Sequence, residues 1–127
     1  MPDKKLILIA EEDKMQATLL AFRLRRKGFR VEMVHHGEGA MRYLKEYHPN
    51  LIICGLELPG LHAFDLLKIA RNRFRESLPV VVLTNNSENR LHPRLFEAGA
   101  TECMTKPVDP AAFVEMVELE LNQFTAL

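Results

Sequence analysis

The order of the apolar segments constrains the fold of this chain more than any other feature. Short apolar runs alternate along the sequence with longer segments in which apolar residues recur at helical spacing. The predicted strands are 6–10, 29–34, 51–54, 79–83 and 101–105. The predicted helices are 14–27, 37–47, 63–73, 91–98 and 110–124. This alternation is typical of a parallel sheet with connecting helices on both faces, so we predict a doubly wound (βα)5 fold of the α/β class.

Local signals indicate where several of these helices begin and end. Asp13 can cap the first helix, and Gly28 supplies the left-handed residue that ends it. Pro93 must fall in the first turn of its helix, because proline lacks an amide donor. Asp109 followed by Pro110 predicts a capped start of the last helix.

Apolar patterns predict which sides of these elements face the core. The recurring apolar residues of the first helix, which we expect to be buried, are Met15, Leu19, Leu20, Phe22 and Leu24. The corresponding residues of the last helix are Phe113, Val117, Leu121 and Phe124. Apolar and charged residues alternate in 29–34, which predicts an exposed face and a position at the edge of the sheet.

Length and composition fit one globular domain. The chain has 127 residues, 47% of them hydrophobic, so we expect one domain over 1–127 with a core of its own. Seventeen basic residues balance seventeen acidic ones, and no overall field favours nucleic acid or an anionic membrane. The longest apolar runs are far shorter than the ~20 residues that cross a bilayer. With no signal segment before the first strand, we expect a cytoplasmic protein that binds neither membrane nor nucleic acid.

The two cysteines are far apart in sequence. Cys54 and Cys103 lack the spacing of a metal site or a redox pair, so we expect reduced thiols with a packing role.

Four stretches resemble the receiver domains of two-component response regulators. They are LILIAEED, LIICGLELPG, VVVLTN and FEAGATECMTKPVD. Each is unspecific alone, but their order and spacing are similar to those of the family over essentially the whole chain. The resemblance implies a flavodoxin-like fold with a parallel sheet in the order 2-1-3-4-5.

The resemblance also implies roles for residues at the strand ends. A receiver takes a phosphoryl group from a phosphohistidine onto an aspartate at the end of the third strand. Glu11 and Glu12 occupy the place of the acidic pair that helps to hold Mg²⁺. The Thr84 hydroxyl and the Lys106 ammonium occupy the places of the groups that contact the phosphoryl group. Gly55 occupies the place of the aspartate. Without a side chain there, the usual aspartyl phosphate cannot form.

Three further departures point to a degenerate receiver, or pseudo-receiver. Each glutamate of the acidic pair is one methylene longer than aspartate, which disfavours a Mg²⁺ site with near-octahedral geometry at ~2.1 Å. Asn85 is larger than the small residue that the family has there, and Cys103 replaces an aromatic residue that swings inward on activation. We therefore expect no cofactor and no working Thr/aromatic switch.

Simpler interpretations exist for two of these features. Gly55 could meet a backbone requirement, either a positive φ angle or a close approach. The acidic cluster could consist of solvated carboxylates at a helix N-terminus. We favour capping for Asp13, and for Glu12 an ion pair with Lys106 that replaces the lost aspartate contact.

The resemblance indicates a protein-interaction module in signalling and not an enzyme. Its expected partners are a histidine kinase, an output domain or another regulator. Receivers commonly use the face formed by the fourth helix, fifth strand and fifth helix for partners and for homodimers. On this chain the face would include Arg94, Glu102, Glu115 and Glu118.

Two other functions remain as alternatives. The first is a phosphorelay receiver with a displaced acceptor, either Glu57 or His62. The second is a flavin- or nucleotide-binding protein, because this fold also binds FMN at its switch point. Against the second, the first strand ends in Glu11 and Glu12, which repel phosphate, and no glycine-rich loop follows.

Overall fold

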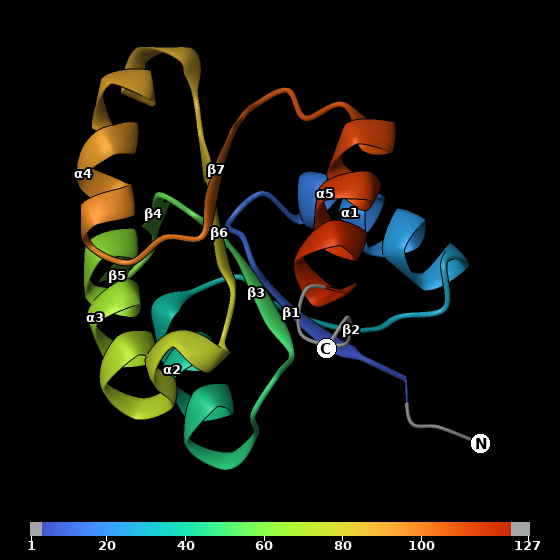
Figure 1. Cartoon of the computed structure of the whole chain (residues 1–127), viewed down its shortest axis with the longest axis horizontal. Coiled ribbons are helices and arrows are strands. Elements are labelled where there is room, and N and C mark those ends of the chain that lie inside the picture. The colour runs from blue at the N-terminus through green and yellow to red at the C-terminus, as the bar shows by residue number, and fades with distance from the viewer. Residues whose placement is uncertain (1–3, 123–127) are drawn as a thin grey trace.

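Five parallel strands form one twisted sheet in the computed structural model, which describes residues 4–122 (Figure 1). The strands are β1 (Leu6–Ala10), β2 (Arg30–Val34), β3 (Leu51–Gly55), β6 (Val80–Thr84) and β7 (Glu102–Thr105). Their spatial order is β2-β1-β3-β6-β7. This is the predicted order 2-1-3-4-5, and it confirms the flavodoxin-like fold.

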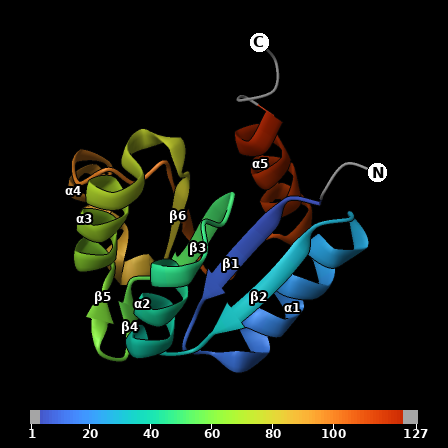
Figure 2. The same ribbon diagram turned by 90° about the horizontal axis from the view of Figure 1, so that it is seen from below.

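Helices cover both faces of the sheet (Figure 2). On one face lie α1 (Lys14–Arg26) and α5 (Pro110–Asn122). On the other lie α2 (Gly37–Glu46), α3 (Ala63–Phe74) and α4 (His92–Glu97). Two 3-10 segments, 75–77 and 86–91, precede β6 and α4.

The three central strands are buried except for Leu6 at the start of β1, and they divide their side chains between two core layers. Alternate residues of a strand point to opposite faces. Ile9 and Ile53 therefore pack under α1 and α5, whereas Leu8 and Ile52 pack under α2, α3 and α4. The edge position predicted for 29–34 is confirmed, because β2 pairs only with β1 in the sheet and keeps Arg30 and Glu32 exposed.

The predicted helix ends are also confirmed. The Asp13 carboxylate accepts a hydrogen bond from the Gln16 N–H at 3.1 Å, and Gly28 has a φ of +95° after α1. Pro93 lies in the first turn of α4, and the Asp109 carboxylate accepts from the Ala112 N–H at 2.9 Å. Phe124 lies outside the residues that the structure describes.

The core face predicted for α1 is wrong for three of its five residues. Met15, Leu19 and Phe22 are 74%, 61% and 55% exposed. The buried residues of α1 are Ala17, Leu20, Ala21 and Leu24. The helix has two apolar faces, and the one with two alanines packs on the sheet because small side chains allow a closer approach.

A small hairpin after β3 was not predicted. It consists of β4 (Glu57–Leu58) and β5 (Leu61–His62), joined by a turn in which Gly60 has a φ of +83°. The hairpin packs against the start of α2, where a Cβ on Gly37 would lie 2.5 Å from the Leu61 Cβ. This close approach holds the chain that leaves β3 beside α2.

Within residues 4–122, no helix combines the length and apolar character needed to span a bilayer.

Candidate functional site

A small pocket of about 150 Å³ opens at the carboxyl ends of the central strands. This edge of a doubly wound sheet is where such folds usually place their chemistry. The pocket is lined by Glu11, Glu12, Gly55, Leu56, Glu57, Leu83, Asn85, Glu88 and Lys106. Four carboxylates therefore surround one ammonium group, and the local charge is acidic.

Glu11 is the buried centre of the pocket, and both of its carboxylate oxygens have partners. Its Oε1 lies 2.6 Å from the Lys106 Nζ, and its Oε2 accepts a hydrogen bond from the Asp13 N–H at 2.9 Å. The contact of Oε1 is an ion pair and not a well-directed hydrogen bond. Because the Lys106 side chain is only 29% exposed, water screens this ion pair less than a surface pair.

Gly55 leaves a space that the Glu11 carboxylate fills. A Cβ built on Gly55 would lie 3.0 Å from Glu11 Oε1. Gly55 is absent from the described residues with positive φ, so an L-residue could adopt its backbone conformation. Of the two backbone interpretations of this glycine, only the close approach fits, and the approaching group is a side chain.

The ion pair predicted between Glu12 and Lys106 is wrong. Glu12 is exposed and lines the outer part of the pocket, while Glu11 forms the pair. Asp13 caps α1, as expected.

Asn85 lines the pocket and is the N-cap of the 3-10 segment 86–91 that follows β6. Its backbone N–H donates to Glu88 Oε1 at 2.7 Å, and its side-chain oxygen accepts from the Ser87 hydroxyl at 2.6 Å. This capping box places the Glu88 carboxylate in the pocket wall. Sequence analysis missed Glu88, although an asparagine followed three residues later by a glutamate is a known capping signal.

Thr84 is at the end of β6 but is not among the residues that line the pocket. Its buried hydroxyl lies 2.7 Å from Nε2 of His92, the first residue of α4. The backbone carbonyl of Thr84 accepts from the Lys106 N–H at 2.7 Å. The hydroxyl therefore joins β6 to α4, a contact that no sequence pattern indicated.

The two alternative acceptors are in different places. Glu57 is exposed and lines the pocket. His62 is the N-cap of α3: its Nδ1 accepts from the Phe64 N–H at 3.2 Å, and its ring stacks on Phe64. His62 does not line the pocket.

Both cysteines are free thiols on the same face of the sheet. Cys54 and Cys103 both align with Val82, so the width of two strand pairings separates them. Two spacings of ~4.8 Å exceed the reach of a disulfide. Burial raises the pKa of Cys54 to about 12 and that of Cys103 to about 11, so both stay protonated at neutral pH.

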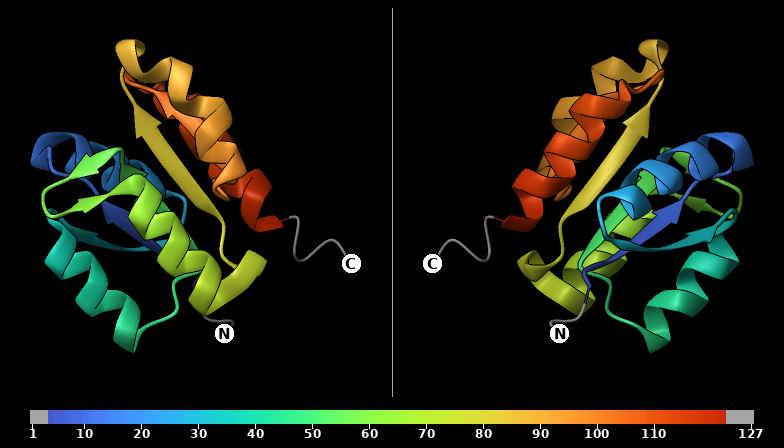
Figure 3. Two further views of the ribbon diagram at one scale, coloured as in Figure 1. Left: turned by 90° about the vertical axis from the view of Figure 1, so that its left-hand side faces the viewer. Right: turned by 90° about the vertical axis from the view of Figure 1, so that its right-hand side faces the viewer.

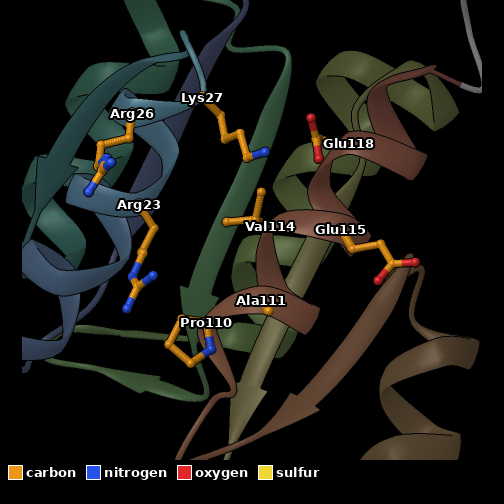
Figure 4. A pocket seen from close by; sticks show the side chains of 8 residues that line it. All are labelled: Arg23, Arg26, Lys27, Pro110, Ala111, Val114, Glu115 and Glu118. Carbon is orange, nitrogen blue, oxygen red and sulfur yellow. The ribbon is translucent and has the colours of Figure 1, made fainter.

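The residues expected on an interaction face divide between two regions. Arg94 is exposed on α4, and Glu102 lies on β7, the edge strand between α4 and α5 (Figure 3). Glu115 and Glu118 line a groove of about 600 Å³ between α1 and α5, opposite Arg23 and other cations of α1 (Figure 4). Both residues border this groove, but the Glu115 side chain points away from α1 (Figure 4).

A buried carboxyl group of α5 was also missed by sequence analysis. Glu120 is only 7% exposed, and its carboxyl group lies near that of Glu102. Burial, followed by repulsion from the Glu102 carboxylate, raises the pKa of Glu120. An acidic residue in the apolar pattern of a helix gave no signal that it would be buried.

In the part of the chain that the structure describes, no group of three or more histidine, cysteine, aspartate or glutamate side chains is arranged to hold a metal ion.

The fold and the pocket together define a class of protein, a flavodoxin-like domain with acidic residues and a lysine at the strand ends. The profile of the response regulator receiver domain matches residues 7–118. The chain belongs to this family, and receivers of this family are signalling modules.

Known proteins of the family resemble the chain over most of its length. It is 32% identical to the transcriptional regulatory protein AfsQ1 of Streptomyces coelicolor over 80% of this chain and 44% of AfsQ1. It is 28% identical to the DNA-binding response regulator MtrA of Mycolicibacterium smegmatis over 92% of this chain and 50% of MtrA. The chain thus spans about half the length of these curated relatives.

A solved structure agrees with the fold. The crystal structure of a putative response regulator from Chloroflexus aurantiacus superposes with a TM-score of 0.87 at 30% identity, covering 94% of this chain and 98% of that one.

Proposed function

We propose that this domain is a pseudo-receiver, a protein-interaction module of two-component signalling that acts without phosphorylation of an aspartate and is not an enzyme. One observation carries the proposal. The Glu11 carboxylate lies beside Gly55 and pairs with Lys106 at 2.6 Å. The lysine that would contact a phosphoryl group is thus already neutralised by a residue of the chain.

The charge of the pocket supports the proposal. A phosphoryl donor is an anion, and four glutamates line the space that it would have to enter. Like charges at short range raise the energy of such an approach. Gly55 offers no nucleophile at the end of this approach.

The donor set does not fit a Mg²⁺ ion, and we propose that none binds. One oxygen of Glu11 pairs with an ammonium and the other with a backbone N–H, while Gly55 provides no ligand. Mg²⁺ requires oxygen ligands in near-octahedral geometry. A cation at Glu11 would first have to displace Lys106.

The pocket also bears on the two alternative functions, a relay receiver with a displaced acceptor and a flavin- or nucleotide-binding protein. Of the two displaced acceptors, Glu57 lines the pocket and His62 does not, so a relay receiver would use Glu57. A pocket of about 150 Å³ is smaller than the ~300–1,000 Å³ typical of ligand sites, and its carboxylates disfavour a flavin or nucleotide phosphate.

The test is the intact mass of the protein after incubation with acetyl phosphate and Mg²⁺. The wild type is compared with Gly55→Asp and with the double variant Glu11→Asp/Gly55→Asp. The double variant is included because a Cβ at position 55 would lie 3.0 Å from Glu11 Oε1, and the shorter aspartate restores room. We expect no phosphoryl adduct on the wild type and an adduct on the double variant.

An adduct on the wild type would overturn the proposal. Mapping it to Glu57 would establish the relay alternative. A double variant that folds but stays unmodified would show that more of the site has been lost than the two substitutions restore.

We further propose that partner proteins, either a histidine kinase, an output domain or another regulator, dock on the surface of α4, β7 and α5. Exposed Arg94, Phe96 and Leu119 lie on these elements. Substituting Arg94→Ala and Phe96→Ser should then abolish capture of such a partner. Retained capture would exclude this surface.

A further inference from the structure

The outer face of α1 carries an apolar stripe that the fold does not use. Met15, Leu19 and Phe22 follow one another at helical spacing and are 74%, 61% and 55% exposed. Rotation of the helix could not bury them without exposing Leu20 and Leu24, which pack under the sheet. Contiguous exposed apolar surface of this kind marks an interaction site.

Charge is ordered along the same helix. Exposed Glu12 and Asp13 precede the helix, whose first residue is exposed Lys14, so the N-terminal end keeps one net negative charge, and the last turn carries Arg23, Arg25 and Arg26. Arg25 is occupied, since it donates to the Val31 carbonyl oxygen at 2.8 Å. Arg26 lies over the Phe22 ring, with its guanidinium carbon 5.7 Å from the centroid, so it borders the apolar stripe.

The outer face of α1 thus has an acidic end, an apolar centre and a basic end. Such a face is complementary to the same face of a second copy that runs in the opposite direction. Two such helices laid antiparallel place Met15 of each copy opposite Phe22 of the other, with the two Leu19 side chains near the axis. The same pairing brings Arg26 of each copy towards Glu12 of the other. A parallel pairing would instead place like charges together.

We propose that a second copy of this chain docks on the outer face of α1, with the two α1 helices antiparallel about a twofold axis near Leu19. Such an interface is isologous, so each residue contact occurs twice. This surface is centred on α1 and meets the α4, β7 and α5 surface proposed for other partners only at the groove beside α5. The inference does not depend on the state of the pocket.

The surroundings of α1 fit this partner. A groove of about 270 Å³ beside the stripe has walls formed largely by Leu19, Leu20, Pro107 and Val108. It provides an apolar recess for side chains of the second copy. The larger groove between α1 and α5 has Arg23, Arg26 and Lys27 on its α1 wall, while Glu115 and Glu118 belong to α5 (Figure 4). The acidic end of the second α1 would lie against the α1 wall.

A helix pair of this length gives a weak dimer. The helix has 13 residues and is therefore ~20 Å long. The area buried stays at or below the ~1,200 Å² where transient complexes are found. We therefore expect a transient dimer that forms at high protein concentration.

The test is sedimentation velocity of the full chain at increasing concentration. We expect a shift from monomer to dimer, and at least a tenfold weaker association for Leu19→Ser and for Phe22→Ser. Both side chains are exposed, so the far-UV circular dichroism and Tm should stay close to those of the wild type. Leu119→Ser is the matched control, because Leu119 is a 58% exposed leucine on α5.

Charge reversal tests the antiparallel direction. Glu12→Arg alone and Arg26→Glu alone should each weaken the dimer. The combined variant Glu12→Arg/Arg26→Glu should restore it, because each copy again presents opposite charges to the other. Double-mutant restoration requires that the two positions meet across the interface.

Three results would overturn the proposal. The first is a monomer at every concentration, which would leave the stripe to a different protein. The second is association that Leu19→Ser and Phe22→Ser leave unchanged. The third is a dimer weakened by Leu119→Ser instead, which would place the homodimer on the surface of α4, β7 and α5.

Discussion

The pleat of two neighbouring strands decides which carboxylate meets Lys106. In the sheet, Ala10 of β1 aligns with Cys54 of β3, so continuing the register by one residue places Glu11 beside Gly55. Glu11 is two residues after Ile9, and Gly55 is two residues after Ile53, so both positions face the same side of the sheet, the one covered by α1 and α5. Glu12 is one residue further and points away. The alternation of side chains along β1 thus indicated Glu11 as the partner of Lys106, and the prediction of an ion pair between Glu12 and Lys106 neglected it.

Glu11→Gln should destabilise the protein by about 1–3 kcal/mol, because it leaves a largely buried ammonium without a counter-charge. Lys106 lies 2.6 Å from Glu11 Oε1 and its side chain is 29% exposed. Urea denaturation measures the change in the free energy of unfolding.

Glu12→Gln is the control for that measurement. Its side chain is exposed, so we expect a change within ~0.5 kcal/mol. Equal effects of the two substitutions would show that the pair with Lys106 contributes little.

Glu120→Gln should stabilise the protein at neutral pH. The folded state raises the pKa of Glu120 above its ordinary value of 4.5, so it holds the proton to higher pH than the unfolded chain. Below 4.5 both states are protonated and there is no penalty. As pH rises through the folded-state pKa, the penalty develops in full and then remains.

Thermal melts of wild type and Glu120→Gln across this range check the sign. The Tm of the variant should exceed that of the wild type by an amount that grows from acidic to neutral pH. A difference independent of pH would show that packing, and not ionisation, is responsible.

At the level of elements, the sequence predicted the five sheet strands and the helix caps, since period, glycine and proline are local signals. The strand order came instead from the resemblance to receivers. The buried face of α1 could not be deduced, because Ala17 and Ala21 attract little attention beside the larger Met15 and Phe22. Two-residue strands such as β4 and β5 are too short to show a period.

Gly37→Ala should destabilise the contact between α2 and the hairpin by about 1–3 kcal/mol. The new Cβ would lie 2.5 Å from the Leu61 Cβ and 2.9 Å from the hairpin backbone, which cannot easily move. Chemical denaturation of Gly37→Ala and of the wild type measures the change in the free energy of unfolding.

Gly39→Ala is the control in the same helix. Its nearest neighbour is the ring of His36, the exposed N-cap of α2, at 3.2 Å, and alanine favours helix, so we expect a smaller loss of stability than for Gly37→Ala. A neutral Gly37→Ala would mean that the hairpin is free to shift.

At the level of the whole molecule, the two helix layers present separate surfaces. The stripe on α1 lies over one face of the sheet, while α4 lies over the other (Figures 1 and 2). A second copy on α1 therefore leaves α4 accessible to a different protein.

The labelling rates of the two thiols can measure how the sheet opens. Cys103 is half-buried on the edge strand β7, and Cys54 is fully buried on the central strand β3. Because only thiolates react and burial raises both pKa values, iodoacetamide at mildly alkaline pH should label Cys103 slowly and Cys54 only through unfolding.

Intact mass and peptide mapping over time distinguish the two reactions. The rate at Cys54 should rise steeply with urea, whereas the rate at Cys103 should change little at low urea. Equal rates at the two sites without denaturant would reveal local opening of the sheet centre.

The packing of Glu11 against Gly55 also limits the evolutionary paths open to this chain. A glycine codon can become an aspartate codon by a single base change. The new side chain would arrive 3.0 Å from Glu11 Oε1 and compete with it for Lys106. An aspartate at position 55 would therefore fit only if the Glu11 side chain moved or were replaced. On the proposal that this domain is a pseudo-receiver, a working acceptor at position 55 would thus depend on both residues together.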